Sequence, residues 1–448
     1  MRITFYGAAQ ETTGACYLLE SSRTKILIDC GLFQQKRVAE DRNYEPFPFN
    51  PKEIEAVLVT HAHLDHTGRI PKLVKSGFDG KIFSTPATGD FAALMLEDSL
   101  GVMLKEVAGD KSRLIYNEED LAKTAEKWQG IPYHQEFEVG GFKIRFLDAG
   151  HILGSAMIEI KVEGRKLVAS GDLGNPPTPL LRPTEKVSDA DFLLLESVYG
   201  NRLHEDRQER KLKIERVIEN TVKAGGVLMI PAFSLERTQE LLFELNDLIE
   251  KGRVPQIPVF LDSPLSIRAT AIYKKYENYY NKEARYIISS GDEVFKFPML
   301  RFTLTTEESK IINDAPSPKI VIAGSGMSTG GRILHHERRY LPDPNSAILM
   351  IGYQSAGSRG RRLQEGAKEI EIFGEKIPVR CRVETVSGYS AHPDREMLLN
   401  FVRNSADTLR KVFVVQGEPA AALFLVQRIR DYLGIDAIAP RYGDEYEL

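Results

Sequence analysis

The first two hundred residues carry hydrophobic positions in short runs, a spacing typical of β-strands. These runs either alternate apolar and polar residues or stay apolar throughout, and most end in loops containing glycine. They are RITFY (2–6), CYLLE (16–20), TKILIDCG (24–31), AVLVT (56–60), the segment 137–171 and DFLLLESVYG (191–200). Residues 86–128 instead repeat apolar side chains with a helical period. The first half therefore predicts a β-rich domain with helices on its outside.

The pattern changes near residue 205, where strands and helices begin to alternate. An amphipathic helix is expected over 204–226, ending at Gly225 and Gly226. The apolar strands that follow, separated by helical stretches, are VLMIPAF (227–233), PVFLDSP (258–264), KIVIAGSG (319–326) and AILMIGY (347–353). This alternation predicts a parallel sheet with helices on both faces. From about residue 375 onward, the pattern alone assigns the strands and helices to neither half.

The composition is that of an ordinary globular protein. Of the 448 residues, 42% are hydrophobic and 27% are charged, and the net charge of −4 gives no bulk attraction to nucleic acid. The three cysteines, without metal-type spacing, indicate reduced thiols in a reducing compartment. The N-terminus shows no signal-peptide pattern, and no apolar run is long enough to span a membrane. We therefore expect a cytoplasmic protein of two or three domains without membrane contact.

The stretch VLVTHAHLDHTGRIP (57–71) concentrates the candidate chemistry. It places His61, His63, Asp65 and His66 directly after an apolar run and uses three of the nine histidines. In an extended segment, residues two positions apart point the same way, so His61 and His63 can reach one metal ion. Asp65 and His66 lie beyond them and can reach a second ion. Imidazoles and carboxylates are ligands that zinc accepts.

Three further polar residues follow strand-like runs in glycine-flanked loops. They are Asp29 in ILIDCG, His151 in LDAGHILGSA and Asp172 in VASGDLGN. Such loops gather at one edge of a sheet, so these side chains can complete a two-metal site that includes a bridging carboxylate. Taken singly, His151 is more typical of a structural histidine and Asp29 of a turn carboxylate. The histidine cluster favours the metal interpretation for both.

The motif HxHxDH after an apolar strand, followed by a glycine-flanked histidine and then GD, resembles the metallo-β-lactamase superfamily. The resemblance implies an αββα sandwich with two zinc ions at its edge. The ligands that it implies are His61, His63 and His151 for the first zinc, Asp65 and His66 for the second, and Asp172 as a bridge. Asp29 would orient one of these ligands.

The rest of the chain resembles the β-CASP nucleases, a family with bacterial and archaeal members that includes the eukaryotic pre-mRNA 3′-end cleavage endonuclease. The resemblance is carried by LLLESVYG (193–200), PAFSLERTQELL (231–242), LDSPLSIRAT (261–270), GSGMSTGGR (324–332), IGYQSAGSRGRRL (351–363) and SGYSAHPD (387–394). It implies an α/β fold in which a parallel-sheet β-CASP domain is inserted into the metallo-β-lactamase sandwich. We expect 1–205 as the first part of the sandwich, 206–374 as the inserted domain and 375–448 as the return segment.

Several small and basic residues of the second half suit a phosphate backbone. The glycines of GSGMSTGGR let backbone N–H groups approach an oxyanion, and SRGRRL (358–363) adds a local basic patch. The alternatives are a plain strand–helix turn, a solvated charge run and, for Arg237 near a helix start, a structural ion pair. The residues expected to contact RNA are Arg237, Ser325, Gly326, Met327, Arg332, Ser355, Arg361, Arg362, Ser387 and Ser390.

From this resemblance we expect a zinc-dependent endoribonuclease that hydrolyses single-stranded RNA in RNA processing or decay. Two zinc ions would activate a water and clamp the scissile phosphate. Catalytic roles are expected for Asp65, Glu196 and His392, with His392 held by Glu196 and protonating the leaving oxygen. As partners we expect single-stranded RNA, and we allow for a homodimer.

Other functions stay open at this point. One is a 5′→3′ exoribonuclease of the RNase J type, although such proteins usually carry SGHAS where this chain has SGYSAHPD (387–394). Another is a non-catalytic RNA-binding subunit of a processing complex. A third is a small-molecule hydrolase such as a thioesterase or a β-lactamase, and the inserted domain argues against it.

One position departs from the family pattern. The segment VFVVQGE (412–418) usually carries histidine where this chain has Gln416, and that histidine completes the second zinc site. A carboxamide oxygen is a weak, neutral zinc ligand compared with imidazole. We therefore expect the second metal to be loosely held, replaced by Mn²⁺ or absent at low metal concentration, with activity retained.

Overall fold

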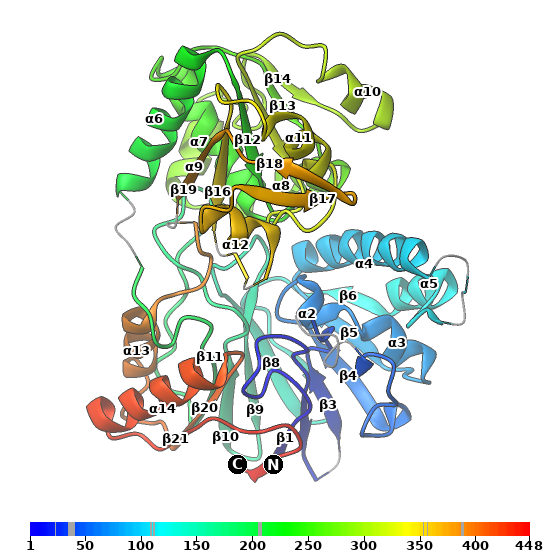
Figure 1. Cartoon of the computed structure of the whole chain (residues 1–448). Coiled ribbons are helices and arrows are strands. Elements are labelled where there is room, and N and C mark those ends of the chain that lie inside the picture. Colours follow the sequence, from blue (N-terminus) through cyan, green and yellow to red (C-terminus); the bar gives the residue numbers. More distant parts are fainter. Residues whose placement is uncertain are drawn as a thin grey trace. The chain divides into compact units, whose positions relative to one another are not determined.

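The computed structural model describes residues 1–22, 24–34, 41–107, 110, 113–204, 208–352, 354–355, 357–386 and 389–448. The chain forms two compact units (Figure 1). The first unit consists of Met1–Pro177, Leu181–Leu203 and Ala391–Leu448, and the second of Thr178–Leu180 and His204–Ser390. Among the helices of the described residues, none has both the length and the apolar character to cross a membrane.

Two seven-stranded sheets form the frame of the first unit, in the orders β22-β1-β2-β3-β4-β5-β6 and β21-β20-β11-β10-β9-β8-β7. The strands of the first sheet are β1 (Arg2–Phe5), β2 (Tyr17–Glu20), β3 (Lys25–Ile28), β4 (Ile54–Leu58), β5 (Lys81–Ser84), β6 (Trp128–Gly130) and β22 (Glu445–Glu447). Those of the second are β7 (Phe137–Val139), β8 (Phe142–Asp148), β9 (Ala156–Val162), β10 (Arg165–Ala169), β11 (Phe192–Glu196), β20 (Lys411–Val415) and β21 (Ala437–Ile438).

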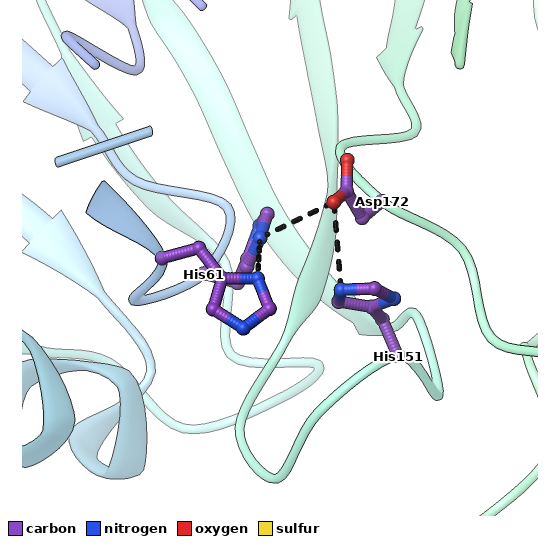
Figure 2. Close-up of side chains that lie close together, drawn as sticks. His61, His151 and Asp172 are labelled. Atoms are coloured by element: carbon purple, nitrogen blue, oxygen red, sulfur yellow. Dashed lines mark hydrogen bonds and ion pairs between the residues drawn. The ribbon is translucent and has the colours of Figure 1, made fainter. Parts of the chain in front are cut away.

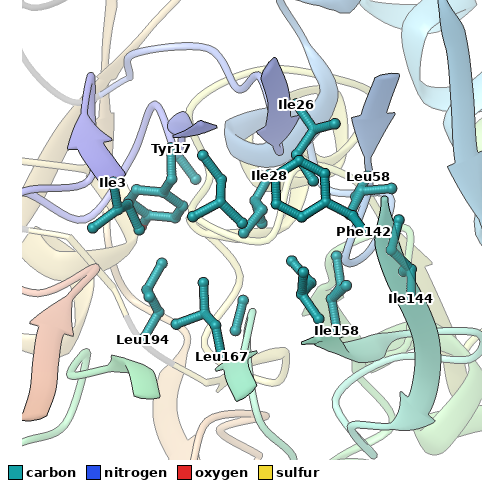
Figure 3. Close-up of a cluster of buried hydrophobic side chains, with 14 of the residues drawn as sticks. Ile3, Tyr17, Ile26, Ile28, Leu58, Phe142, Ile144, Ile158, Leu167 and Leu194 are labelled. Carbon is teal, nitrogen blue, oxygen red and sulfur yellow. The ribbon is translucent and has the colours of Figure 1, made fainter. Parts of the chain in front are cut away.

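The inner faces of these two sheets share one hydrophobic core (Figure 3). Successive side chains of a strand lie on opposite faces, so alternate residues reach this core. Ile26, Ile28 and Leu58 come from the first sheet. Ile158 and Leu194 come from the second, and each of the five is at most 1% exposed. Burial on both inner faces explains why the apolar runs of the first half are short and closely spaced.

Helices cover the outer face of each sheet. α3 (Ile70–Lys75) shares a second core with β4, and α13 (Arg395–Arg403) and α14 (Pro419–Leu433) share a third with β11 and β20. Among the described residues of this unit, the other α-helices are α2 (Leu64–Thr67), α4 (Pro86–Glu106) and α5 (Glu118–Lys127). The αββα sandwich predicted from the sequence is confirmed.

The C-terminal segment completes both sheets of the first unit. β20 pairs in parallel with β11, and β22 pairs antiparallel with β1. Phe413 and Val415 of β20 lie in the core between the sheets, at most 3% exposed. The last part of the chain is therefore an integral layer of the sandwich.

The second unit contains a six-stranded parallel sheet in the order β14-β13-β15-β12-β16-β19. Its strands are β12 (Val227–Pro231), β13 (Val259–Leu261), β14 (Leu300–Phe302), β15 (Lys319–Ala323), β16 (Ala347–Ile351) and β19 (Arg382–Val386). Its helices are α6 (Gln208–Ala224), α7 (Arg237–Glu250), α8 (Pro264–Lys275), α9 (Lys282–Ser289), α10 (Thr306–Ile311), α11 (Ile333–Tyr340) and α12 (Arg359–Gln364), and β17 (Glu369–Ile372) pairs with β18 (Glu375–Pro378). The parallel sheet predicted from strand–helix alternation is confirmed.

This unit extends further than the range 206–374 expected for the inserted domain. β18 pairs with β17, and β19 pairs in parallel with β16, so residues 375–390 belong to the second unit. Pairing between distant strands leaves no mark on local periodicity, which is why the pattern alone left this segment unassigned.

Truncating Ile158 to alanine tests the core between the sheets. Ile158 is fully buried, and the cavity left behind should lower the free energy of unfolding of the first unit by about 2–5 kcal/mol. Lys143→Ala, on the exposed side of β8, is the control and should stay within about 0.5 kcal/mol of the parent. Urea denaturation followed by circular dichroism measures both, and equal values would contradict the placement of Ile158.

Candidate metal centre

The predicted ligands of the first metal lie in loops that follow three strands of the first unit. His61 and His63 follow β4, His151 follows β8 and Asp172 follows β10. One ligand atom of each lies within 4.8 Å of the ligand atoms of the others. Figure 2 shows His61 and His151 directed toward the carboxylate of Asp172. The fold thus brings together four donors that are far apart in sequence, which we call the four-donor group.

One oxygen of Asp172 faces the imidazoles of this group. Its Oδ2 lies 3.5 Å from His61 Nε2 and 3.4 Å from His151 Nε2. His61 Nε2 is also 3.0 Å from His63 Nδ1. His61, His151 and Asp172 are at most 3% exposed. Three imidazoles and one carboxylate at this spacing match the donor set and geometry of a tetrahedral zinc site.

Burial and neighbouring charge set the protonation of these groups. Burial lowers the pKa of His61 well below its ordinary value, which favours the neutral ring that a metal requires. Burial alone would raise the pKa of Asp172. The rings of His61 and His66 outweigh that effect and hold the pKa of Asp172 well below its ordinary value. The anionic form of Asp172 is therefore favoured.

The ligands predicted for a second metal lie at the other oxygen of Asp172. His66 Nε2 is 3.5 Å from Asp172 Oδ1 and 3.8 Å from Asp65 Oδ2. Gln416 follows β20 and places its amide nitrogen 2.6 Å from His66 Nε2. The same nitrogen donates a hydrogen bond to Asp172 Oδ1. The residue that departs from the family pattern therefore contacts two of the predicted ligands directly.

Asp29 contacts His66 from the side opposite to Asp172. The ring nitrogen Nδ1 of His66 lies 2.6 Å from Asp29 Oδ2. The N–H and hydroxyl of Thr60 donate to the two oxygens of Asp29, each at 2.8 Å. A carboxylate at Nδ1 turns Nε2 toward Asp172, as expected for a residue that orients a ligand. Thr60, which holds Asp29, was not predicted from the sequence. Its only sequence signal is its position directly before His61, between the apolar run and the histidine motif.

His392 and Glu196 form a pair next to the four-donor group. His392 Nδ1 lies 3.1 Å from Glu196 Oε2 and 3.8 Å from Asp172 Oδ2. Glu196, at the end of β11, is fully buried and accepts the N–H of Leu173. Burial lowers the pKa of His392, but the carboxylates of Glu196 and Asp172 outweigh burial and raise that pKa to about 9. The ring is therefore cationic at neutral pH, with Nδ1 bound to Glu196.

A glycine allows close approach to the histidine motif. A Cβ at Gly31 would lie 1.5 Å from the carbonyl oxygen of Asp65. The N–H of Ala15 donates to that same carbonyl at 2.9 Å, and the N–H of Cys30 donates to the carbonyl of His66 at 2.8 Å. The motif is thus held by backbone hydrogen bonds from two neighbouring loops, and only glycine fits at residue 31.

The described residues predicted to contact RNA lie in the second unit, and two of the arginines, Arg237 and Arg332, pair there with buried carboxylates. Arg237 is 7% exposed and forms ion pairs with Glu236 and Glu240, which favours the structural ion pair for this residue. Arg332 donates to the buried carboxylate of Asp262 and to two backbone carbonyl groups. Both side chains therefore have structural roles, whatever else they bind.

The residues of the GSGMSTGGR loop hydrogen-bond both to one another and to neighbouring segments. Ser325 Oγ accepts the N–H groups of Thr329 and Gly330, so these two donors already have a partner. Ser355 Oγ contacts the sulfur of Met327, and the carbonyl of Gly326 accepts from Gln354. Arg361 pairs with Glu365, and Arg362 donates to the carbonyl of Glu369. Ser390 is buried, and Ser387 lies outside the described residues. Contact of these residues with RNA stays a prediction.

Three protein-family models match successive parts of the chain. Residues 10–218 match the model of the metallo-beta-lactamase superfamily, 238–363 the Beta-Casp domain, and 376–440 the Zn-dependent metallo-hydrolase RNA specificity domain. Ribonuclease TTHA0252 of Thermus thermophilus is 38% identical over 99% of both chains. The chain belongs to the β-CASP family of the metallo-β-lactamase superfamily. It is therefore a hydrolase with a centre for divalent metal.

Other β-CASP relatives show how far the similarity extends. Transcription termination factor FttA of Methanosarcina mazei is 32% identical over 98% of this chain and 70% of its own length. An RNase J-like protein of Methanocaldococcus jannaschii is 31% identical over 98% of both chains. A crystal structure from Enterococcus faecalis V583, of a protein of unknown function, matches 100% of this chain and 99% of its own with a TM-score of 0.60. At 12% identity, that last likeness concerns the fold alone.

Replacing Gly31 by alanine tests the close approach beneath the motif. The added Cβ displaces the carbonyl of Asp65, so we expect weaker metal binding and a free energy of unfolding lowered by about 1–3 kcal/mol. Gly101→Ala is the matched control, because a Cβ there meets no described atom within 4 Å. Calorimetric zinc titration and thermal melting report on the two effects. Parent-like values for Gly31→Ala would contradict the close approach.

Replacing Asp262 by asparagine tests the anchor of Arg332. Burial raises the pKa of Asp262, but hydrogen bonds led by that from His336 outweigh it and lower the pKa to about 2. Its stabilisation, about 2 kcal/mol, is therefore complete above the unfolded pKa near 4 and is lost as the pH falls toward 2. Asp262→Asn should lower stability at pH 7, and the gap to the parent should narrow in acid. Denaturation at pH 7 and pH 3, with Glu307→Gln as an exposed control, checks this expectation.

Proposed function

We propose that the protein is a metal-dependent endoribonuclease that hydrolyses phosphodiester bonds of single-stranded RNA. The supporting observation is that the carboxylate of Asp172 serves both the four-donor group and the His392–Glu196 pair. In this proposal, a candidate metal-binding group lies next to a candidate proton donor. The match to an RNA specificity domain and the name of the ribonuclease relative support RNA as the substrate class.

The four-donor group fits a divalent cation, and zinc in particular, because three of its donors are imidazoles. When bound there, the cation supplies Lewis-acid polarisation of the phosphate and lowers the pKa of a water. The family pattern implies a second zinc at Asp65, His66 and Asp172. That position has a weaker donor set here, because Gln416 stands where an imidazole is expected.

His392 is the candidate proton donor. Its Nδ1 is bound to Glu196, so the proton available to substrate is the one on Nε2, on the opposite side of the ring. The attacking group would be hydroxide, the water having already lost one proton to solvent. As its oxygen forms the bond to phosphorus, the bond to the leaving oxygen breaks and that oxygen takes the Nε2 proton of His392, which solvent then restores. Glu196 keeps the ring in place throughout, because it is buried and held by the N–H of Leu173.

Alanine variants at two histidines separate metal binding from proton transfer. His151→Ala removes a donor, so we expect loss of bound zinc and of RNA cleavage. His392→Ala should retain zinc and lower kcat by about 10²–10⁴-fold, the range of general-acid catalysis. His335→Ala, an exposed histidine of the second unit, is the control and should match the parent. Full activity of His392→Ala would exclude the proposed proton donor.

RNA substrates without an accessible 5′ end distinguish endonucleolytic from exonucleolytic cleavage. We expect the zinc-loaded protein to cleave a circular single-stranded RNA and a linear RNA with a blocked 5′ end, because an endonuclease requires no free end. Resistance of both substrates alongside digestion of RNA with a 5′ monophosphate would instead establish the 5′→3′ exonuclease alternative, which the RNase J-like relative represents. A zinc-loaded protein that binds RNA and cleaves none would establish the non-catalytic alternative.

A further inference from the structure

The side-chain amide of Gln416 lies between two atoms that are spaced as ligands of one ion. Its nitrogen is 2.6 Å from His66 Nε2 and donates to Asp172 Oδ1. These two atoms are 3.5 Å apart. Two ligand atoms of one tetrahedral zinc are separated by about 3.4 Å, as bond lengths of about 2.0–2.2 Å require. The amide nitrogen therefore occupies the place that a second cation would take.

The chemistry of Asp172 determines whether the NH₂ or the carbonyl oxygen of the Gln416 amide faces it. A carboxylate oxygen only accepts hydrogen bonds, so the group in contact with Asp172 Oδ1 is the NH₂ and not the carbonyl oxygen. A glutamine that binds a metal uses its carbonyl oxygen. Gln416 thus presents its non-coordinating end to the predicted ligands.

The surroundings of Gln416 hold the amide in this place. Its backbone N–H donates to Ala8 O at 2.7 Å, and its carbonyl accepts from the N–H of Ser197 at 3.4 Å. The residue is 2% exposed. The cavity that it lines with Tyr17 and Thr60 has a volume of about 10 Å³, which is room for one water and too little for a carboxamide.

We infer that the Gln416 amide replaces the second cation, so that the centre binds one divalent cation tightly. This inference rests on the proposed function, in which the four-donor group holds the first ion. The two oxygens of Asp172 then have separate tasks. Oδ2 faces His61 and His151, and Oδ1 is held by the amide donor. The hydrogen bond keeps the carboxylate oriented, as a bridging ion would.

Two variants of Gln416 distinguish a blocking amide from a weak ligand. Gln416→Ala removes the amide without adding a donor. If the amide blocks the position, this variant should bind a second zinc at least about 10-fold more tightly than the parent, because contacts next to a metal site change metal affinity on that scale. If Gln416 were a ligand, the same variant would bind the second zinc more weakly. Gln416→His adds an imidazole and should bind two zinc ions per chain.

The measurement is zinc binding by the full chain, independent of its activity. Metal-free protein is titrated with Zn²⁺ by calorimetry, and ions retained after gel filtration are counted by mass spectrometry. Cadmium-113 NMR should give one resonance for the parent and two for Gln416→His. Gln129→His, which puts an imidazole on the exposed face of β6, is the control and should behave as the parent.

Each outcome decides between stated alternatives. One retained ion in the parent, together with tighter second-ion binding in Gln416→Ala, supports the inference. Two tightly held ions in the parent, or weaker second-ion binding in Gln416→Ala, would overturn it and leave the proposed nuclease intact. A parent that retains no ion at all would overturn the proposed function and this inference with it.

Discussion

The candidate centre depends on the burial of one carboxylate, that of Asp172. A buried anion is costly unless its oxygens are paired, and this one meets imidazoles at Oδ2 and an amide donor at Oδ1. Those partners come from the loops after β4, β8 and β20, so one charge ties together parts of both sheets. His392, which is paired with Glu196, also lies next to the carboxylate of Asp172. Removing the negative charge would therefore disturb metal binding and proton donation together.

The residues of the candidate metal centre could be singled out from the sequence because their signal is local. His61, His63, Asp65 and His66 stand together after an apolar run, and glycines flank His151 and Asp172. Resemblance to a family was needed for Gln416, since a glutamine after a strand carries no chemical signal of its own. The contacts of these residues then came from the structure, because strand pairing decides which loops meet.

Other parts of the molecule could not be predicted, and the reasons are physical. Gly31 was noticed only as the end of a strand, yet it is required because another backbone passes where its Cβ would be. RNA contact by Arg237 and Arg332 stays a prediction. Their ion pairs could not be derived from charge alone, because a positive charge in a sequence does not reveal which carboxylate is nearby. For Arg237 the partners are Glu236 and Glu240, which are near it in sequence, and a structural ion pair was one of the alternatives that the sequence left open. For Arg332 the partner Asp262 is distant, and only the fold brings it close.

The pairing of β20 with β11 has a consequence for the synthesis of this protein. Glu196 ends β11, and its partner across the ladder is Val415, the residue before Gln416. A growing polypeptide that has not yet reached β20 lacks the strand that flanks β11, so the sheet that carries Glu196 is completed only when the C-terminal segment has been made.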